Sequence, residues 1–319
     1  MTPAPLVSVL MTAYNRAPFI GASIQSVLAQ TFSDFELLIV DDQSTDGTLD
    51  IARGYERGDC RIRVVVNERN LGDYGNRNRA AELARGSFLK YHDSDDLMYP
   101  HCLAAMVPPM QVYPEAAFGL SSGSYWFGGP CPMPMTPRMA YQREFLGSGM
   151  FNAGPAGAIF RADAFRLLGR FTDAGAPSDY LFWLRACARV MVLLLPADLF
   201  WYRVHADQEL QSPGVARQYA ETIRDTWAAL ADPACPLTAP EREQARRNVM
   251  ARQLKLLWRD IRARRFALAH TRIAAGPTLG EWIHYLRLPQ RDAWAGTPPF
   301  DERAGRAPSA PAVNDAMRS

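Results

Sequence analysis

The amino-acid sequence predicts an α/β fold, with a mostly parallel sheet flanked by helices and a helical C-terminal extension. The first reason is an alternation along residues 6–91, where short apolar runs are separated by segments of helical composition. Such strand–helix repeats are typical of parallel sheets with helices on both faces. The second reason is that the residues beyond Pro213 keep a helical pattern and contain no further strand-like run.

Four strands and three helices are expected in the first part of the chain. The run 6–11 is apolar and β-branched, as a buried strand requires, and Pro18 suits the first turn of the helix that follows. A strand at 35–40 then leads to a helix that Thr45 or Asp46 caps. The same alternation continues with a strand at 62–66, a helix at 72–84 and a strand at 87–91.

The pattern is looser from about Pro108. Residues 119–157 are rich in Gly, Pro, Ser and Met, a composition common in binding loops and lids. Regular elements then return as a strand at 158–161, helices near 162–168 and from about Ser178, and a strand at 190–195. We therefore expect an α/β domain over 1–212 (halves 1–105 and 106–212), a helical region over 213–290 and a disordered tail over 291–319.

The composition is that of an ordinary globular protein. The 319 residues are 48% hydrophobic and 21% charged, and the net charge of +2 does not call for nucleic acid as a partner. The five cysteines show no CxxC or metal-ligand spacing, which favours free thiols in a reducing compartment. The N-terminus lacks the basic region of a signal peptide, and no apolar run is long enough to span a membrane. We expect a cytoplasmic protein.

Polar clusters follow the strands at their carboxyl ends. They are Ala13-Tyr14-Asn15, Asp41-Asp42 and the Asp-rich run 93–96. Ligands of open parallel sheets bind outside the carboxyl ends of the strands, where the strand order reverses. Three independent helix caps would explain the clusters less simply than one shared site does.

The run Asp93-Ser94-Asp95-Asp96 predicts a cation site. Its three carboxylates repel one another, so a cation is expected beside them. Hard oxygen ligands suit Mg²⁺ or Mn²⁺, which also bind diphosphates. The alternative is an Asp-rich turn that caps the next helix. The glycine-rich fingerprints of dinucleotide-binding proteins and P-loop NTPases are absent, so a bound nucleotide would need its phosphates held in another way.

Four motifs in this order resemble those of a family 2 glycosyltransferase. They are 7–15 (VSVLMTAYN), 40–48 (VDDQSTDGT), Asn70-Leu71-Gly72 with Arg77-Asn78, and 93–96 (DSDD). The resemblance is close over residues 5–105 and looser over 150–205. It implies the GT-A fold, a Rossmann-like sheet, and inverting transfer of a sugar from a nucleotide donor.

The resemblance also implies roles in donor binding. Ala13, Tyr14 and Asn15, with Asp41 or Asp42, would form the base and ribose pocket, the ring of Tyr14 offering a stacking face. The alternative is that Tyr14 only packs and Asp42 caps a helix. Arg69 or Arg77 would approach the diphosphate, because guanidinium groups suit planar oxyanions; a solvated surface arginine is the alternative for each.

The same resemblance assigns the metal ligands. Asp93 and Asp95 would form the DxD motif, with Asp95 the main ligand of Mn²⁺ or Mg²⁺ and Asp96 a second ligand. Asp93 would contact ribose or a water bound to the metal. The segment Tyr202-Arg203-Val204-His205 resembles one in which Arg203 or His205 contacts phosphate or metal, and a structural role for His205 stays open.

Asp179 is the expected catalytic base. In the resembling family the base is usually the Asp of a Glu-Asp pair that opens a helix, followed by a hydrophobic-Trp-Leu-Arg stretch. Residues 178–185 (SDYLFWLR) match this pattern, with Ser178 in place of Glu. The alternative is that Ser178 or Asp179 only caps the helix.

The predicted function is therefore metal-dependent, inverting glycosyl transfer to an acceptor hydroxyl. UDP is the first donor nucleotide to expect, and the acceptor would be a glycan, a lipid-linked glycan or another hydroxyl compound of bacterial surface polysaccharide or lipopolysaccharide synthesis. A nucleotide-sugar-forming nucleotidyltransferase and a non-catalytic nucleotide-sugar-binding protein are the alternatives. The basic stretch 246–265 predicts either peripheral contact with the inner face of the membrane or a solvated helical face that packs on the catalytic domain or on a second subunit.

Overall fold

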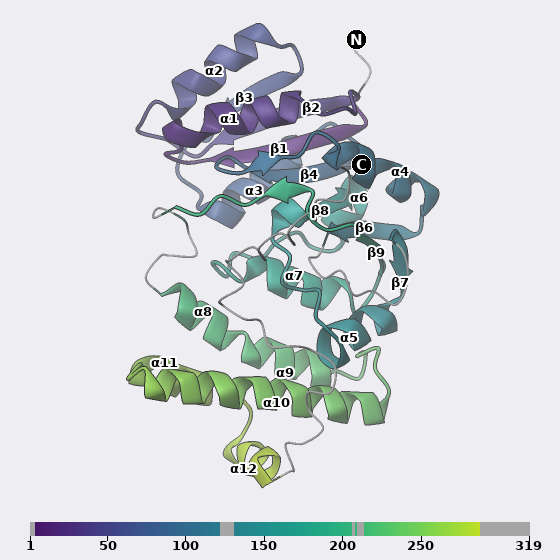
Figure 1. Ribbon diagram of the computed structural model, residues 1–319, viewed down its shortest axis with the longest axis vertical. Helices are drawn as coiled ribbons and strands as arrows, with labels where there is room; N and C mark the ends of the chain where they lie inside the picture. Colours follow the sequence, from purple (N-terminus) through teal and green to yellow (C-terminus); the bar gives the residue numbers. More distant parts are fainter. Residues whose placement is uncertain (1–3, 122–130, 206–207, 209–213, 288–319) are drawn as a thin grey trace, which may run out of the picture.

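The computed structural model describes residues 4–121, 131–205, 208 and 214–287. Within them, a central sheet has the strand order β3-β2-β1-β4-β8-β6-β9-β7. Figure 1 shows this sheet with its flanking helices in one part of the molecule and helices α8–α11 stacked beside it, with α12 beyond. The expected α/β sheet with a helical C-terminal region is confirmed.

The N-terminal half is the regular strand–helix alternation that the sequence predicts. Its four strands pair in parallel in the order β3-β2-β1-β4. Because the chain moves outward from β1 to β3 and then returns to the other side of β1, the strand order reverses between β1 and β4. These elements are β1 (Val7–Ala13), α1 (Ala17–Leu28), β2 (Phe35–Asp41), α2 (Thr48–Gly58), β3 (Ile62–Val66), α3 (Asp73–Leu83) and β4 (Phe88–Asp93).

The second half of the sheet is mixed. Strand β8 (Ala158–Arg161) runs antiparallel to β4 and to β6 (Ala116–Ser121), and β9 (Met191–Leu195) runs parallel to β6. A small separate sheet pairs β5 (Leu97–Met98) with β10 (Phe200–Trp201). The helices here are α4 (Cys102–Val112), α6 (Ala162–Leu167) and α7 (Ser178–Ala186), and a 3₁₀ turn spans Pro155–Gly157.

The segment 119–157 is more regular than its composition suggests. It contains β7 (Met133–Met135), which pairs with β9, and helix α5 (Pro137–Leu146). The signals for α5 are local: Pro137 occupies the first turn, and the Thr136 hydroxyl accepts a hydrogen bond from the Met139 amide. The expectation of binding loops or lids was therefore wrong for residues 119–121, which belong to β6, and for residues 133–146.

The core lies on both faces of the sheet. Along β1, Leu10 faces one cluster, which includes Phe160 and Trp183, whereas Val9 and Met11 face the other, which includes helices α1 and α4. A strand buried on both faces reads as a continuous apolar run, which is why these strands can be predicted from the sequence.

The C-terminal region is helical as far as the structure describes it. Helix α10 begins with a capping box between Thr238 and Glu241, and it lies along α5, where Asn248 donates to the Phe145 carbonyl. None of the helices in the described residues is long and apolar enough to cross a membrane. The expected tail, 291–319, lies outside the described residues. The helices are α8 (Val215–Glu221), α9 (Ile223–Ala231), α10 (Ala239–Arg262), α11 (Phe266–Ala275) and α12 (Leu279–Arg287).

Candidate active site

The candidate site lies where the strand order reverses. Ala13 ends β1 and is in register with Asp41 of β2, and Thr12 is in register with Asp93 of β4. The loops after β1, β2 and β4 therefore meet at one edge of the sheet, the position at which open α/β sheets bind ligands.

The loop after β1 is fastened to the loop after β2. Asn15 adopts a left-handed backbone conformation, with φ of 51°, which Asn tolerates better than most residues. Its side-chain Oδ1 accepts a hydrogen bond from the Thr45 amide at 2.8 Å, and its own amide donates to the Ser44 hydroxyl at 2.9 Å. Tyr14, in contrast, is 47% exposed. Its ring is open to a planar ligand, while Asn15 holds the loop.

The paired carboxylates Asp41 and Asp42 have different environments. Asp42 accepts hydrogen bonds from the Asn67 side chain at 2.7 Å and from the Leu71 and Gly72 amides at 2.9–3.0 Å. It therefore holds the loop before α3. The Asp41 carboxylate accepts one hydrogen bond, from the Ser44 amide to Oδ1, and its Oδ2 is buried with no hydrogen-bond partner. The spare acceptor of this pair is thus on Asp41.

Arg77 lies next to the Asp-rich turn, and its charge also acts on Asp179. It is buried on α3 and forms ion pairs with Asp73 at 2.9 Å and with Asp93 at 2.8 Å. Burial alone would raise the pKa of Asp93, but the Arg77 guanidinium outweighs it and holds that pKa below its ordinary value. Arg69, the other arginine considered for the diphosphate, lies exposed in the loop before α3.

Arg16, Arg203 and His205 contact the Asp95 and Asp96 carboxylates of the Asp-rich turn. The Asp95 Oδ2 atom lies 3.0 Å from Arg16 Nε and 3.0 Å from His205 Nε2. Asp96 is fully buried; its Oδ1 accepts from the Arg203 amide at 2.9 Å, and its Oδ2 has no hydrogen-bond partner. Burial, with the nearby Asp93 charge, raises the pKa of Asp96 to about 8.

These residues fit a divalent cation that takes the rest of its ligands from a substrate. No group of three or more His, Cys, Asp or Glu side chains with metal-ligand geometry occurs in the part of the chain that the structure describes. Mg²⁺, however, commonly binds through one or two carboxylates and the phosphates of its substrate. The unpartnered Oδ2 of Asp96 and the adjacent Asp95 carboxylate provide such a pair of donors.

The segment after β10 closes this side of the site. Arg203 donates to the Asp95 carbonyl at 2.7 Å, and the His205 ring lies 4.6 Å from the Phe19 ring of α1. The Nδ1 atom of His205 is buried without a hydrogen-bond partner. His205 therefore holds Asp95 with one ring nitrogen and keeps the other available. His92, inside β4, contacts Ser23 at 3.0 Å, and its burial lowers its pKa to about 3, as a packed neutral histidine requires.

Asp179 lies across the site at the first turn of α7. Its Oδ1 accepts from the Tyr180 amide at 2.6 Å, and its amide donates to the Tyr74 hydroxyl of α3 at 3.3 Å. Burial raises the pKa of Asp179 to about 7, against the opposing effects of the Tyr180 amide and of the Arg77 charge. A carboxylate with a pKa near neutrality suits a general base.

Ser178 has its own structural task. It is fully buried, its hydroxyl donates to the Gly175 carbonyl at 2.7 Å, and it accepts from the Ala174 amide at 3.0 Å. The hydroxyl thus closes the turn that presents Asp179.

Two contacts in the site were not predicted from the sequence, Arg16 with Asp95 and Tyr74 with Asp179. Arg16 directly follows Asn15, so its position in the loop was the available signal.

A sequence model described as "Glycosyl transferase family 2" matches residues 8–169. The chain belongs to this family. The matched region contains β1 to β8 and hence Asp41, Arg77 and the Asp-rich turn, whereas Asp179 and His205 lie beyond it.

Curated relatives share the N-terminal part of the chain. Over 92 residues, 29% of the chain, it is 48% identical to a "putative teichuronic acid biosynthesis glycosyltransferase TuaG" from Bacillus subtilis, 36% of which is covered. Over 105 residues, 33% of the chain, it is 41% identical to "UDP-Glc:alpha-D-GlcNAc-diphosphoundecaprenol beta-1,3-glucosyltransferase WfgD" from Escherichia coli, 41% of which is covered. The matches therefore span about two fifths or less of these two relatives.

Solved structures share the fold over most of the chain. S. aureus TarS (residues 1–349), in complex with UDP-GlcNAc, has a TM-score of 0.58 at 21% identity and covers 88% of this chain and 79% of its own. The mannosyltransferase PcManGT from Pyrobaculum calidifontis, in complex with GDP-Man and Mn²⁺, has a TM-score of 0.59 at 18% identity, with coverage of 89% and 79%. At these identities the likeness shows the fold alone, and the fold is the GT-A fold.

Proposed function

We propose that the protein is a metal-dependent, inverting glycosyltransferase that moves a sugar from a nucleoside-diphosphate donor to an acceptor hydroxyl. The observation that carries the proposal is that acidic residues lie on both sides of Arg77. On one side lie Asp93, Asp95 and Asp96; on the other lies Asp179, whose pKa burial raises to about 7.

The donor would bind along the carboxyl ends of β1, β2 and β4. Tyr14 would offer its exposed ring to the base, which would sit beside Ala13 and Asn15, and the unpartnered Oδ2 of Asp41 would accept a hydrogen bond from the base or ribose. Asp42 would contribute by keeping the loop before α3 in place. Arg77, and Arg69 if its loop closes on the ligand, would attract the diphosphate.

Asp95 and Asp96 would hold Mn²⁺ or Mg²⁺, with His205 as a further ligand or as support for Asp95. The bound ion would supply positive charge at the diphosphate as it leaves. Arg16 and His205 orient the Asp95 carboxylate, and Asp93, which Arg77 keeps ionised, would contact the ribose or a water.

Asp179 would take the proton of the acceptor hydroxyl as that oxygen attacks the anomeric carbon. In the attack the new C–O bond forms on the face opposite the breaking C–O bond to the diphosphate, so the configuration inverts. A base with a pKa of about 7 is ionised in half of the molecules at that pH and can accept the proton.

The descriptions of similar proteins support candidates for the nucleotide and the acceptor. UDP is the first candidate, since one similar structure contains UDP-GlcNAc and one relative is described as using UDP-Glc; dTDP and GDP are further candidates. The acceptor would be a glycan or lipid-linked glycan of surface polysaccharide synthesis, as the description of the Escherichia coli relative suggests. The protein would then act in the cytoplasm, at the inner face of the membrane.

A thermal-shift panel tests the donor site. Wild type, Asp95→Asn and an exposed control, Asp50→Ala, are melted with UDP, GDP, dTDP and their sugars, with and without Mn²⁺. A ligand at a hundred times its Kd should stabilise the folded protein by about 2.7 kcal/mol. We expect a Mn²⁺-dependent shift with one nucleotide in wild type and in Asp50→Ala, and its loss in Asp95→Asn. Absence of any shift in wild type would overturn the donor-site proposal.

A further inference from the structure

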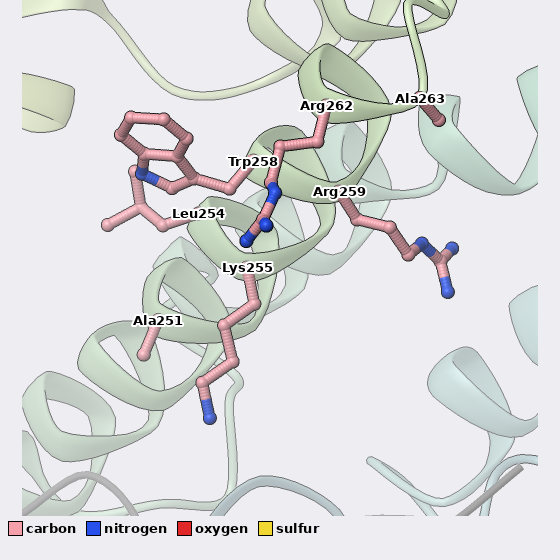
Figure 2. Close-up of a pocket in the computed structure, with 7 residues that line it drawn as sticks. All are labelled: Ala251, Leu254, Lys255, Trp258, Arg259, Arg262 and Ala263. Carbon is pink, nitrogen blue, oxygen red and sulfur yellow. The ribbon is translucent and has the colours of Figure 1, made fainter.

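One side of α10 and the turn into α11 form a basic and apolar surface. Trp258 is 64% exposed, Phe266 63% and Ile261 40%. Between them lie Arg259 and Arg262, also exposed. A shallow cavity of about 850 Å³ runs along this side of the helix from Ala251 to Ala263. Figure 2 shows Trp258 beside Leu254, with Lys255, Arg259 and Arg262 projecting from neighbouring turns. We call the exposed residues Lys255, Trp258, Arg259, Ile261, Arg262 and Phe266 the α10 surface.

The charge of this region is one-sided. Residues 241–272 contain ten Arg or Lys against three acids, a local charge of +7 in a protein of net charge +2. Asp260 is the one acid between residues 244 and 280, and it is fully buried. It pairs with Arg265 at 2.9 Å and with Arg272 at 2.7 Å. Arg265 and Arg272 therefore neutralise the negative charge of Asp260 inside the α10–α11 junction. Asp260 does not reduce the positive charge of the α10 surface.

The side chains suit an interface between water and lipid. Lys and Arg lay their apolar stems along such a boundary and keep their charges at the headgroups, and Trp is enriched there because its ring is apolar with one polar N–H. Helices that lie on membranes combine these two features on one face. A protein partner would need a matching acidic surface.

We propose that the α10 surface docks the protein on a bilayer that contains anionic lipids. In Figure 1, α10 lies on the far side of the molecule from α1 and α2. The inference deepens the proposed function, because it would bring a lipid-linked acceptor near the enzyme. It does not need that function in order to be tested, since binding to lipid is measured without turnover.

The test is co-sedimentation of the full-length protein with phosphatidylcholine vesicles, with and without phosphatidylglycerol. The variant Lys255→Gln/Arg259→Gln/Arg262→Gln removes three charges from the α10 surface. The control Arg57→Gln/Arg166→Gln/Arg189→Gln removes three exposed charges elsewhere. Wild type and control should bind the phosphatidylglycerol vesicles, and the α10 variant should lose about a hundredfold in partitioning, because each charge near the surface contributes about 1 kcal/mol, or about 0.7 of a decade. Binding should also weaken as salt is added.

Two further variants keep the result interpretable. Trp258→Ser should weaken vesicle binding without changing the melting temperature, since the side chain is mostly exposed. Asp179→Asn should bind vesicles like wild type, so that a failure of the catalytic proposal is separated from a failure of docking. Equal binding by the α10 and control variants would overturn the proposal. Wild type that ignores anionic vesicles and instead dimerises through Trp258 would overturn it too.

Discussion

Replacing Asp179 by Asn should remove activity and stabilise the protein at the same time. The Asp179 pKa of about 7 lies above the ordinary value of 3.8 because the carboxyl is buried. Between these values the folded protein holds a proton that the unfolded chain has released, so stability falls as pH rises from about 4 to about 7. The loss is complete above pH 7. At about 1.36 kcal/mol for each of about three pKa units, the free energy of unfolding falls by at most about 4 kcal/mol.

Asparagine avoids this loss because it carries no charge. Its side-chain oxygen can still accept the hydrogen bond that the Tyr180 amide donates to Asp179. We therefore expect Asp179→Asn to unfold at higher urea concentration than wild type at pH 8, and to differ little from it near pH 4. The exposed control Asp173→Asn should show no such pH-dependent gain.

Activity should change in the opposite direction. A positioned general base contributes about 10²–10⁴-fold, so nucleoside-diphosphate release in the presence of acceptor should fall by at least about a hundredfold in Asp179→Asn. In wild type, kcat/KM should fall tenfold per pH unit below about 7, since the base is then protonated. Donor affinity, measured by thermal shift, should not change. Wild-type turnover by the variant, or equal stability of the two proteins at pH 8, would refute the reasoning.

Three other substitutions test the parts of the site. Arg77→Met should lower the free energy of unfolding by about 3 kcal/mol, because it leaves the Asp93 carboxylate largely buried without its cation. It should also weaken binding of the nucleotide-sugar donor. The control is Arg79→Met at an exposed position, and equal urea midpoints of the two variants would contradict the role of Arg77. Asp42→Ala should cost about 3 kcal/mol in urea unfolding, since the Asn67 side chain and the Leu71 and Gly72 amides lose their acceptor; unchanged stability would show that the loop does not need it. Ser178→Ala should cost about 1 kcal/mol through its two lost hydrogen bonds and leave the pH dependence of kcat/KM in place; a shifted pH profile would mean that Ser178 acts on the base itself.

The sequence predicted strands β1 to β4, β8 and β9 because their signals are local, whereas β6 was not expected. Strands such as β2 are buried on both faces and read as apolar runs, and the polar residues that end them are adjacent in the sequence. Topology then brings these ends together at the point where the strand order reverses.

The sequence did not show how neighbouring polar residues divide their tasks. Asp41 and Asp42 are the same residue type at adjacent positions, so the sequence does not distinguish them. The Asp42 carboxylate accepts hydrogen bonds from the Leu71 and Gly72 amides, about thirty residues away in the chain, while Asp41 keeps a spare acceptor. The Tyr74–Asp179 contact joins residues 105 positions apart, and such contacts leave no periodic pattern. Helix α5 was missed because the Pro- and Gly-rich residues on both sides of it outweighed the short Thr136-Pro137 signal.

The central claim is displacement at the anomeric carbon, with Asp179 opposite the diphosphate. The anomeric configuration of the transferred sugar tests this claim most directly. The donor identified by thermal shift is incubated with an acceptor that supports turnover, and the product is examined by NMR. The account predicts a product whose configuration is opposite to that of the donor, formed by wild type and absent with Asp179→Asn. A product that retains the donor's configuration would contradict it.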